Sequence, residues 1–220
     1  MTEFKLLVFD WDGTLMDSAA RIVACFNAAI MDVGLEPLPD AAIRNIIGLG
    51  LREALDQLAP GADIVLRQQL VDRYRHHYLY ANQTPSPLFP GADAMVRELG
   101  EQGYFLAVAT GKGRQGLNRV LEETGCKGLF HATRCADETF SKPHPQMLLE
   151  LMSELNVSPG ETLMIGDTEY DLQMAKNAGT VALGVSYGAH ERDRLLKCEP
   201  LACLDSFEEL RGWLSRPPVN

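Results

Sequence analysis

Four nearly continuous apolar segments alternate with helix-like patterns along this chain, and no other feature limits its possible folds as strongly. The segments read "FKLLVFD" (4–10), "YFLAVAT" (104–110), "TLMIGD" (162–167) and "TVALGV" (180–185). Their length and their content of β-forming residues indicate strands that are buried on both faces, as in a parallel sheet. The helical patterns between them read "ADAMVRELGEQG", "GLNRVLEETG", "PQMLLELMSEL" and "YDLQMAKNAG". This alternation predicts an α/β fold with a doubly wound parallel sheet.

Residues 17 to 83 interrupt the alternation. The stretch "DSAARIVACFNAAIMDVG" predicts a helix with Ser18 as its N-cap and Gly34 as its stop, and "LREALDQLAP" and "ADIVLRQQLVDRYRHHYLY" continue the helical pattern with no strand between them. The segment ends at "TPSPLFPG" (84–91), where three prolines and a glycine predict a stiff linker. We therefore expect a catalytic core formed by 1–16 and 84–220, with an inserted helical cap domain over 17–83.

Composition narrows the possible partners. The 220 residues are 46% hydrophobic and carry a formal net charge of −10, which is unfavourable for binding nucleic acid or an anionic membrane surface. No apolar run reaches the length of a membrane span. The five cysteines are odd in number and form no CxxC pair, which favours reduced thiols and a cytoplasmic location. The five histidines show no ligand spacing, so we expect no zinc site.

Polar side chains follow three of the predicted strands at the points where the strands end. Asp10 and Asp12 follow the first strand, Thr110 closes the second, and Asp167 closes the third. In open α/β sheets ligands bind at the carboxyl ends of the strands, so these side chains are expected at one edge. Lys142 in "SKPHP" belongs with them as an amine. Each residue alone could be a helix cap or a solvated loop residue, but their joint order favours a site.

These motifs resemble those of the haloacid dehalogenase-like superfamily of phosphotransferases. "DWDGT" is similar to its first motif, "ATGK" to its second, "SKPHP" to its third and "GDTEYD" to its fourth. The helical insert after the first motif resembles the small cap of the phosphoglycolate phosphatase type, so the resemblance covers essentially the whole chain. It implies a Rossmann-like core and a phosphatase that hydrolyses small phosphomonoesters, such as phosphoglycolate or sugar phosphates.

The resemblance also implies roles for the residues at the strand ends. Asp10 is the expected nucleophile and Asp12 the expected general acid/base, while Thr110 and Lys142 hold the phosphoryl group. A carboxylate that attacks phosphorus forms an aspartyl-phosphate, which divides one difficult step into two. Glycine lets backbone N–H groups approach phosphoryl oxygens closely. This role is expected at Gly13 and at Gly111.

A magnesium ion is the expected cofactor. Mg²⁺ prefers oxygen ligands and offsets the repulsion between clustered carboxylates. The resemblance implies that Asp10, Asp167 and the backbone carbonyl of Asp12 bind the metal. We expect Asp171 to hold Lys142 or a metal-bound water instead of the ion itself.

Several alternatives stay open at this stage. Asp12 disfavours a dehalogenase or a phosphonate-cleaving enzyme, but phosphomutases keep both acids. "GKGRQG" (111–116) matches the dinucleotide-binding pattern GxGxxG, and Asp137 lies where a ribose-binding acid could be, which would suggest an NAD(P)-dependent oxidoreductase. That interpretation leaves the clustered acids without roles. A catalytically silent phosphate-sensing module is a third alternative, which the intact acids disfavour.

Substrate choice is expected to lie in the cap. The loop "GLGL" (48–51), with Arg44 or Arg52 nearby, is a candidate for contact with the substrate, although it can also be a plain helix-to-helix turn. The roles of Lys112 and Glu169 remain undecided, because either can be a simple surface charge.

Overall fold

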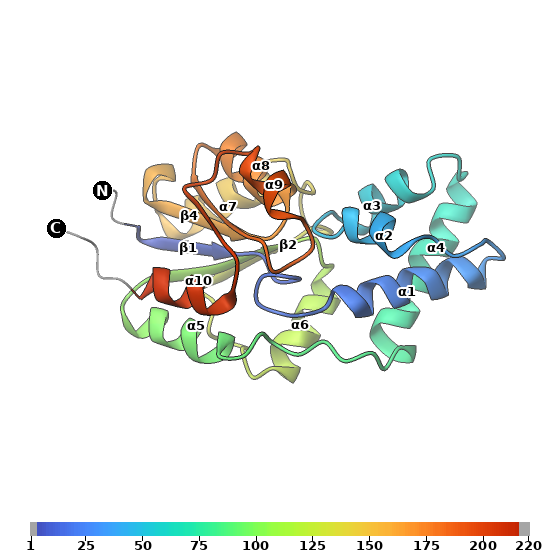
Figure 1. Cartoon of the computed structure of the whole chain (residues 1–220), viewed down its shortest axis with the longest axis horizontal. Helices are drawn as coiled ribbons and strands as arrows, with labels where there is room; N and C mark the ends of the chain where they lie inside the picture. Colours follow the sequence, from blue (N-terminus) through green and yellow to red (C-terminus); the bar gives the residue numbers. More distant parts are fainter. Residues whose placement is uncertain (1–3, 216–220) are drawn as a thin grey trace.

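A six-stranded, fully parallel sheet forms the centre of the structure, a computed structural model that describes residues 4–215 (Figure 1). The strand order is β3-β2-β1-β4-β5-β6. The strands are β1 (Leu6–Phe9), β2 (Phe105–Thr110), β3 (Ala132–Cys135), β4 (Thr162–Gly166), β5 (Val181–Val185) and β6 (Ala202–Leu204). The doubly wound parallel sheet predicted from the sequence is confirmed; the terminal parts of the predicted core, 1–3 and 216–220, lie outside the described residues.

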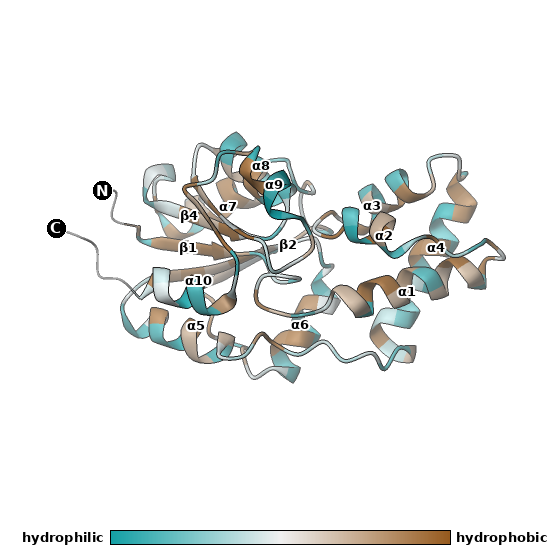
Figure 2. Cartoon of the chain, in the orientation of Figure 1, coloured by the Kyte–Doolittle hydropathy of each residue, from teal (hydrophilic) through white to brown (hydrophobic). Residues whose placement is uncertain are grey.

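Helices cover both faces of the sheet. One face packs against α5 (Ala92–Glu101), α6 (Arg114–Glu123) and α10 (Phe207–Leu214). The other packs against α7 (Gln146–Leu155), α8 (Glu169–Ala178) and α9 (Arg192–Leu196), with a short 3₁₀ helix, η2 (Pro159–Glu161), before β4. Side chains alternate along a strand, so Leu7 and Phe9 of β1 enter the first core and Leu6 and Val8 the second. Both faces of β1 are therefore buried, and Figure 2 shows the central strands as hydrophobic.

A group of helices lies beyond the carboxyl ends of the strands, at the right of Figure 1. We call them the cap helices: α1 (Ala19–Asp32), α2 (Asp40–Asn45), α3 (Leu51–Leu58), α4 (Ile64–His76) and the π-helix η1 (His77–Ala81). They bury a hydrophobic cluster that includes Phe26 of α1, Leu55 of α3 and Leu70 of α4, and Tyr170 of α8 joins it from the core. The helical content predicted for this segment is present, and it packs around a core separate from that of the sheet.

Hydrogen bonds also join the cap helices to the core. Asn45, at the end of α2, accepts a hydrogen bond on its backbone carbonyl from the Tyr170 hydroxyl (3.0 Å) and lies 3.1 Å from Nε2 of His190. The other ring nitrogen of His190 accepts from the backbone N–H of Glu169, so Nε2 carries the proton and donates to Asn45. The side-chain oxygen of Asn45 accepts from Arg194 (2.5 Å). Three core side chains therefore hold one cap residue.

Some elements differ from the sequence prediction. The strands β3 and β6 were not predicted, because they have only four and three residues and lie at the sheet edges, where part of each strand is not fully buried. The helix predicted over 62–80 is instead α4 followed by the π-turn of η1. Between residues 4 and 215, no helix has both the length and the apolar character that a membrane crossing needs.

Candidate active site

The acidic and hydroxyl side chains at the strand ends come together because β1 lies between β2 and β4. Phe9, the last residue of β1, is in register with Val108 of β2 and Ile165 of β4, so the three strands end side by side. Asp10, Thr110 and Asp167 follow from these ends, and all three are fully buried. The predicted convergence at one sheet edge is what the structure shows.

Asp10 is held by a lysine from another loop. Lys142, between β3 and α7, places Nζ 2.7 Å from Oδ1 of Asp10 and 2.6 Å from Oδ1 of Asp171. Oδ2 of Asp10 is buried without a hydrogen-bond partner among the described residues. Burial, together with the neighbouring Asp171 and Asp12, raises the pKa of Asp10 to about 7 against the opposing effect of Lys142. One oxygen of Asp10 is thus fixed, and the other is free to react or to bind a cation.

Asp171 lies in the first turn of α8, and its two oxygens are both engaged. Oδ1 pairs with Lys142, while Oδ2 accepts from the backbone N–H and the hydroxyl of Thr168 at 3.1 and 2.7 Å. Asp171 therefore holds Lys142, one of the two contacts anticipated from the sequence. Burial alone would lower the pKa of Lys142, but the two carboxylates raise it above its usual value, so the ammonium stays charged.

Asp167 lies in a tight backbone cradle. Its oxygens accept hydrogen bonds from the Thr14 hydroxyl (2.9 Å) and from the backbone N–H of Ala189 (2.7 Å). A Cβ atom added at Gly13, where φ is +86°, would lie 2.2 Å from Oδ2 of Asp167. A residue with a Cβ atom would clash with Asp167, so position 13 requires glycine. Burial and the nearby Asp10 raise the pKa of Asp167 well above its usual value.

These acids fit a hard cation. Carboxylate oxygens of Asp10, Asp167 and Asp171 all lie within 4.8 Å of one another, and the group contains no histidine or cysteine. Oxygen donors without nitrogen or sulfur suit Mg²⁺ better than zinc. All three acids have other contacts, and Oδ2 of Asp10 is the carboxylate oxygen of this cluster with neither a hydrogen bond nor an ion pair among the described residues.

Asp12 has a different set of partners. Oδ1 of Asp12 accepts from the Ser18 hydroxyl at 2.5 Å and lies 2.9 Å from Nζ of Lys112, which also donates to the Tyr78 hydroxyl. Tyr78 belongs to η1 of the cap helices. The ammonium of Lys112 therefore connects a cap residue, Tyr78, to Asp12. Ser18 does precede α1, but its hydroxyl makes no capping bond, because it is turned toward Asp12.

Both undecided charged residues have defined partners. Lys112 is 9% exposed and is no surface charge. Burial alone would lower its pKa, but Asp12 and Tyr78 raise it above the usual value. Glu169 is half-buried and pairs with Arg194 at 2.6 Å, on the side of the core that holds Asn45.

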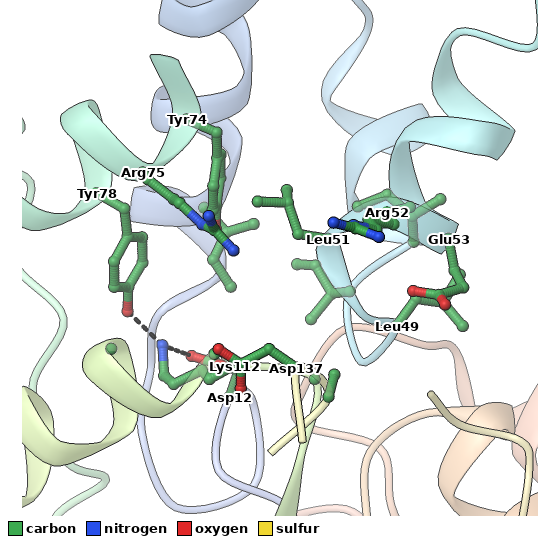
Figure 3. A pocket seen from close by; sticks show the side chains of 18 of the residues that line it. Asp12, Leu49, Leu51, Arg52, Glu53, Tyr74, Arg75, Tyr78, Lys112 and Asp137 are labelled. Carbon is green, nitrogen blue, oxygen red and sulfur yellow. Dashed lines mark hydrogen bonds and ion pairs between the residues drawn. The ribbon is translucent and has the colours of Figure 1, made fainter. Parts of the chain in front are cut away.

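A cavity of about 610 Å³ opens between the core and the cap helices (Figure 3). Asp12, Gly111, Lys112 and Asp137 lie on its core side. Most of its cap side is apolar or aromatic, with these lining residues: Ile22, Phe26, Ile46, Ile47, Leu49, Leu51, Ala54, Tyr74, Tyr78 and Leu79. A ligand held beside Asp12 would therefore meet an apolar wall.

The loop over 48–51 is more than a turn between helices. A Cβ atom at Gly111 would lie 2.4 Å from the carbonyl oxygen of Leu49, and one at Gly48 would lie 2.8 Å from the Thr168 hydroxyl. The backbone N–H of Gly50 donates to the Ser141 hydroxyl at 2.8 Å. The loop therefore packs directly on the second, third and fourth motifs. Of the two arginines considered near it, Arg52 lines the cavity and Arg44 does not.

The segment GKGRQG does follow a strand and open a helix, α6, but its geometry does not suit a dinucleotide. The carboxylate of Asp137 accepts from the backbone N–H of Arg114 at 2.9 Å and would lie 2.8 Å from a Cβ atom at Gly113. A carboxylate thus occupies the helix N-terminus where a pyrophosphate would bind. Asp137 caps the helix in place of binding a ribose, so the oxidoreductase interpretation is not favoured.

A comparison with protein families decides the assignment. The model of the haloacid dehalogenase-like hydrolases matches residues 7–185, from β1 to the end of β5. The chain belongs to this family. The match includes all four motifs and the cap helices, as the sequence resemblance implied.

Two relatives of known sequence are phosphatases by name. The chain is 39% identical over 215 residues to the "Probable phosphatase IndB" of Dickeya dadantii, covering 94% of this chain and 92% of that protein. It is 31% identical over 216 residues to the phosphoglycolate phosphatase of Vibrio vulnificus, covering 94% and 95% of the two chains. This chain is accordingly a phosphatase, and a phosphomutase is not favoured.

Solved structures agree on the fold. A haloacid dehalogenase-like hydrolase from Bacteroides fragilis superposes with a TM-score of 0.88 at 25% identity, covering 94% of this chain and all of that one. A predicted phosphoglycolate phosphatase from Haemophilus somnus superposes with a TM-score of 0.83 at 26% identity, covering 97% and 99%. Both superpositions therefore extend over nearly the whole length of the chain.

Sequence reasoning missed the second acid's partners. The sequence predicts a helix cap at Ser18, gives no defined role to Lys112, and places Tyr78 in a predicted helix without a role of its own. Only the spacing offered a signal, since Lys112 comes two residues after the strand-end Thr110. A lysine in a loop looks the same in the sequence whether it is solvated or buried against a carboxylate.

We expect Tyr78→Phe to reduce kcat about tenfold with a smaller change in KM. The substitution keeps the ring but removes the hydroxyl that fixes Lys112 against Asp12, and a hydrogen bond to a charged group contributes about 1.5–3 kcal/mol. Tyr80→Phe is the matched control, because the Tyr80 hydroxyl of the same π-helix accepts a hydrogen bond from Gln115 of the core and makes no contact with Lys112 or Asp12. Steady-state kinetics checks both; equal kcat values for the two variants would contradict the role of Tyr78.

Proposed function

We propose that the protein is a Mg²⁺-dependent phosphatase that hydrolyses small phosphomonoesters through an aspartyl-phosphate on Asp10. The observation that carries the proposal is the contrast between the two acids of the first motif. Asp10 is fully buried with Oδ2 unpartnered, whereas Asp12 is held by a hydroxyl and an ammonium beside the cavity. Two carboxylates in such different surroundings are suited to two different roles.

In the first step, Asp10 attacks phosphorus and the bond to the leaving alkoxide breaks. Asp12 gives that alkoxide a proton, so the alcohol departs neutral. In the second step, Asp12 takes a proton from water, whose oxygen attacks phosphorus and releases Asp10. Inorganic phosphate is the product, and both acids return to their starting states.

Other residues of the site would bind the phosphoryl group. Lys142 neutralises negative charge beside Asp10, and Thr110 offers a hydroxyl at the neighbouring strand end. Gly13 and Gly111 leave their backbone N–H groups accessible at close range. Asp10, Asp167 and the backbone carbonyl of Asp12 would hold Mg²⁺, which stabilises charge on the phosphoryl oxygens.

We further propose a small organic phosphate as the substrate and the cytoplasm as the place of action. The cavity lies beneath the cap helices, which we propose span residues 17–83 and exclude water and folded macromolecules from the site. The net charge of −10 repels nucleic acid. All five cysteines are free thiols and four of them are buried, which suits a reducing compartment.

Removal of the metal gives the first test. Phosphate release from 4-nitrophenyl phosphate should be lost in the presence of a chelator and return when Mg²⁺ is added in excess, because Asp10 and Asp167 repel each other and the substrate without the ion. A colorimetric assay measures both states. Full activity in metal-free buffer would contradict metal dependence.

The second test concerns Asp12. Asp12→Asn should slow turnover about 10²–10⁴-fold, since proton transfer is lost. With a leaving group that needs no proton, such as 4-nitrophenolate, the first step should persist and the phosphorylated enzyme should accumulate. Rapid acid quenching and mass spectrometry detect the added phosphoryl group. Turnover at the wild-type rate with an alkyl phosphate would rule out Asp12 as the acid.

A further inference from the structure

Two arginines without partners line the cap side of the cavity. Arg52 lies in the first turn of α3 and Arg75 in the last turn of α4. In the view of Figure 3 their guanidinium groups extend from opposite walls toward the space above Asp12. Neither forms a hydrogen bond or an ion pair with any residue between 4 and 215. A guanidinium presents a fork of donors that matches an anionic oxygen pair.

The acids near this cavity already have other neighbours. The side chain of Glu53 lies against the start of its own helix: its Oε2 would be 2.5 Å from a Cβ atom at Gly50. Asp137 caps α6, and Asp12 pairs with Lys112. The positive charge of the two arginines is therefore left for a ligand.

The cavity is also larger than a minimal substrate needs. The loop over 48–51 packs on Gly111 and Ser141, so the cap is in contact with the core, yet about 610 Å³ remains between them. Cavities of this volume accommodate ligands of drug size. Phosphoglycolate, the substrate named for several relatives, has only two carbons and would leave most of the apolar wall uncovered.

We infer that Arg52 and Arg75 form an anion-binding subsite of this phosphatase. The inference rests on the proposed function: the phosphoryl group binds at Asp10, an apolar body contacts the cap wall, and a second anionic group on that body binds the two arginines. The second group is a carboxylate or another phosphate. Substrates with this second charge are selected over neutral analogues of the same size.

The test compares two aryl phosphates of matched size, 4-carboxyphenyl phosphate and 4-carbamoylphenyl phosphate. The wild type should show a kcat/KM about tenfold higher for the carboxylate, the effect of one charge-assisted contact. Arg52→Gln or Arg75→Gln should bring that ratio close to one. The matched control is Arg73→Gln on the same helix, because Arg73 pairs with Asp32 and does not line the cavity. 1,4-Phenylene bisphosphate, which carries a second phosphate, distinguishes the two anion types.

The ratio separates the inference from the proposed function. Hydrolysis of both compounds at equal kcat/KM, or a preference that survives both arginine substitutions, would overturn the subsite while leaving the phosphatase proposal intact. Hydrolysis of no phosphomonoester would contradict the proposed function. Calorimetric titration with the non-hydrolysable 4-(phosphonomethyl)benzoate and its amide then tests the subsite by itself, with about tenfold tighter binding of the benzoate expected and equal binding contradicting it.

Discussion

Asp10→Asn should abolish phosphatase activity, with a loss of at least about a thousandfold, and should remove every trace of phosphorylated enzyme. An amide oxygen is a poor nucleophile, and no other carboxylate in the cluster can replace Asp10. Asp171 is engaged by Lys142 and Thr168, and Asp167 by Thr14 and Ala189. Steady-state assays and acid-quenched mass spectrometry measure the two effects.

The same variant should fold at least as stably as the wild type. Three buried carboxylates lie together, and the ammonium of Lys142 pairs with only two of them, Asp10 and Asp171. Burial raises the pKa of Asp10 to about 7, so a neutral side chain at this position relieves repulsion. Thermal unfolding followed by circular dichroism should give an unchanged or higher midpoint. A lower midpoint would mean that lost activity reflects lost structure, and near-normal turnover would show that Asp10 is not the nucleophile.

Lys142→Met should destabilise the protein by about 3–5 kcal/mol in metal-free buffer and also eliminate turnover. The ammonium is fully buried between Asp10 and Asp171, so its removal leaves carboxylates together without a compensating charge. Urea unfolding measures the free energy of unfolding. Added Mg²⁺ should restore part of the stability, because an ion held by these acids, as proposed, would bind the folded state only.

Lys127→Met supplies the control for this experiment. Lys127 pairs with Glu122 at 2.6 Å, but both side chains are largely exposed, so water replaces the lost contact. Its unfolding curve should nearly coincide with that of the wild type. If Lys142→Met unfolded at the same urea concentration as Lys127→Met, the buried ion pairs would contribute nothing to stability.

The parts of this molecule predicted best from the sequence are those that repeat a simple pattern. β1, β2, β4 and β5 are continuous apolar runs, and a parallel sheet then requires that Asp10, Thr110 and Asp167 leave it at the same edge. The four motifs and their order along the chain indicated the family. β3 reads "ATRC", with Arg134 only half-buried, and four such residues resemble loop sequence as much as strand.

Contacts between distant segments could not be predicted in the same way. Lys112 meets Tyr78 across 34 positions, and Arg52 and Arg75 reach one cavity from different helices. Their placement depends on how the cap helices rest on the core, which no local pattern encodes. The roles of the site residues are therefore predictions that the substitutions above test.

The three hydrogen bonds that hold Asn45 have a consequence for how products leave. Each bond contributes about 1 kcal/mol when exchange with water is included, so together they favour the closed arrangement by about 3 kcal/mol. Taken alone, that difference corresponds to an open population of about 0.6%, and the contacts of Gly50 with Ser141 and of Tyr78 with Lys112 lower the population further. The cap would then be closed for most of each catalytic cycle and would open only briefly. The frequency of those openings sets an upper limit on the rate at which phosphate and alcohol leave the site.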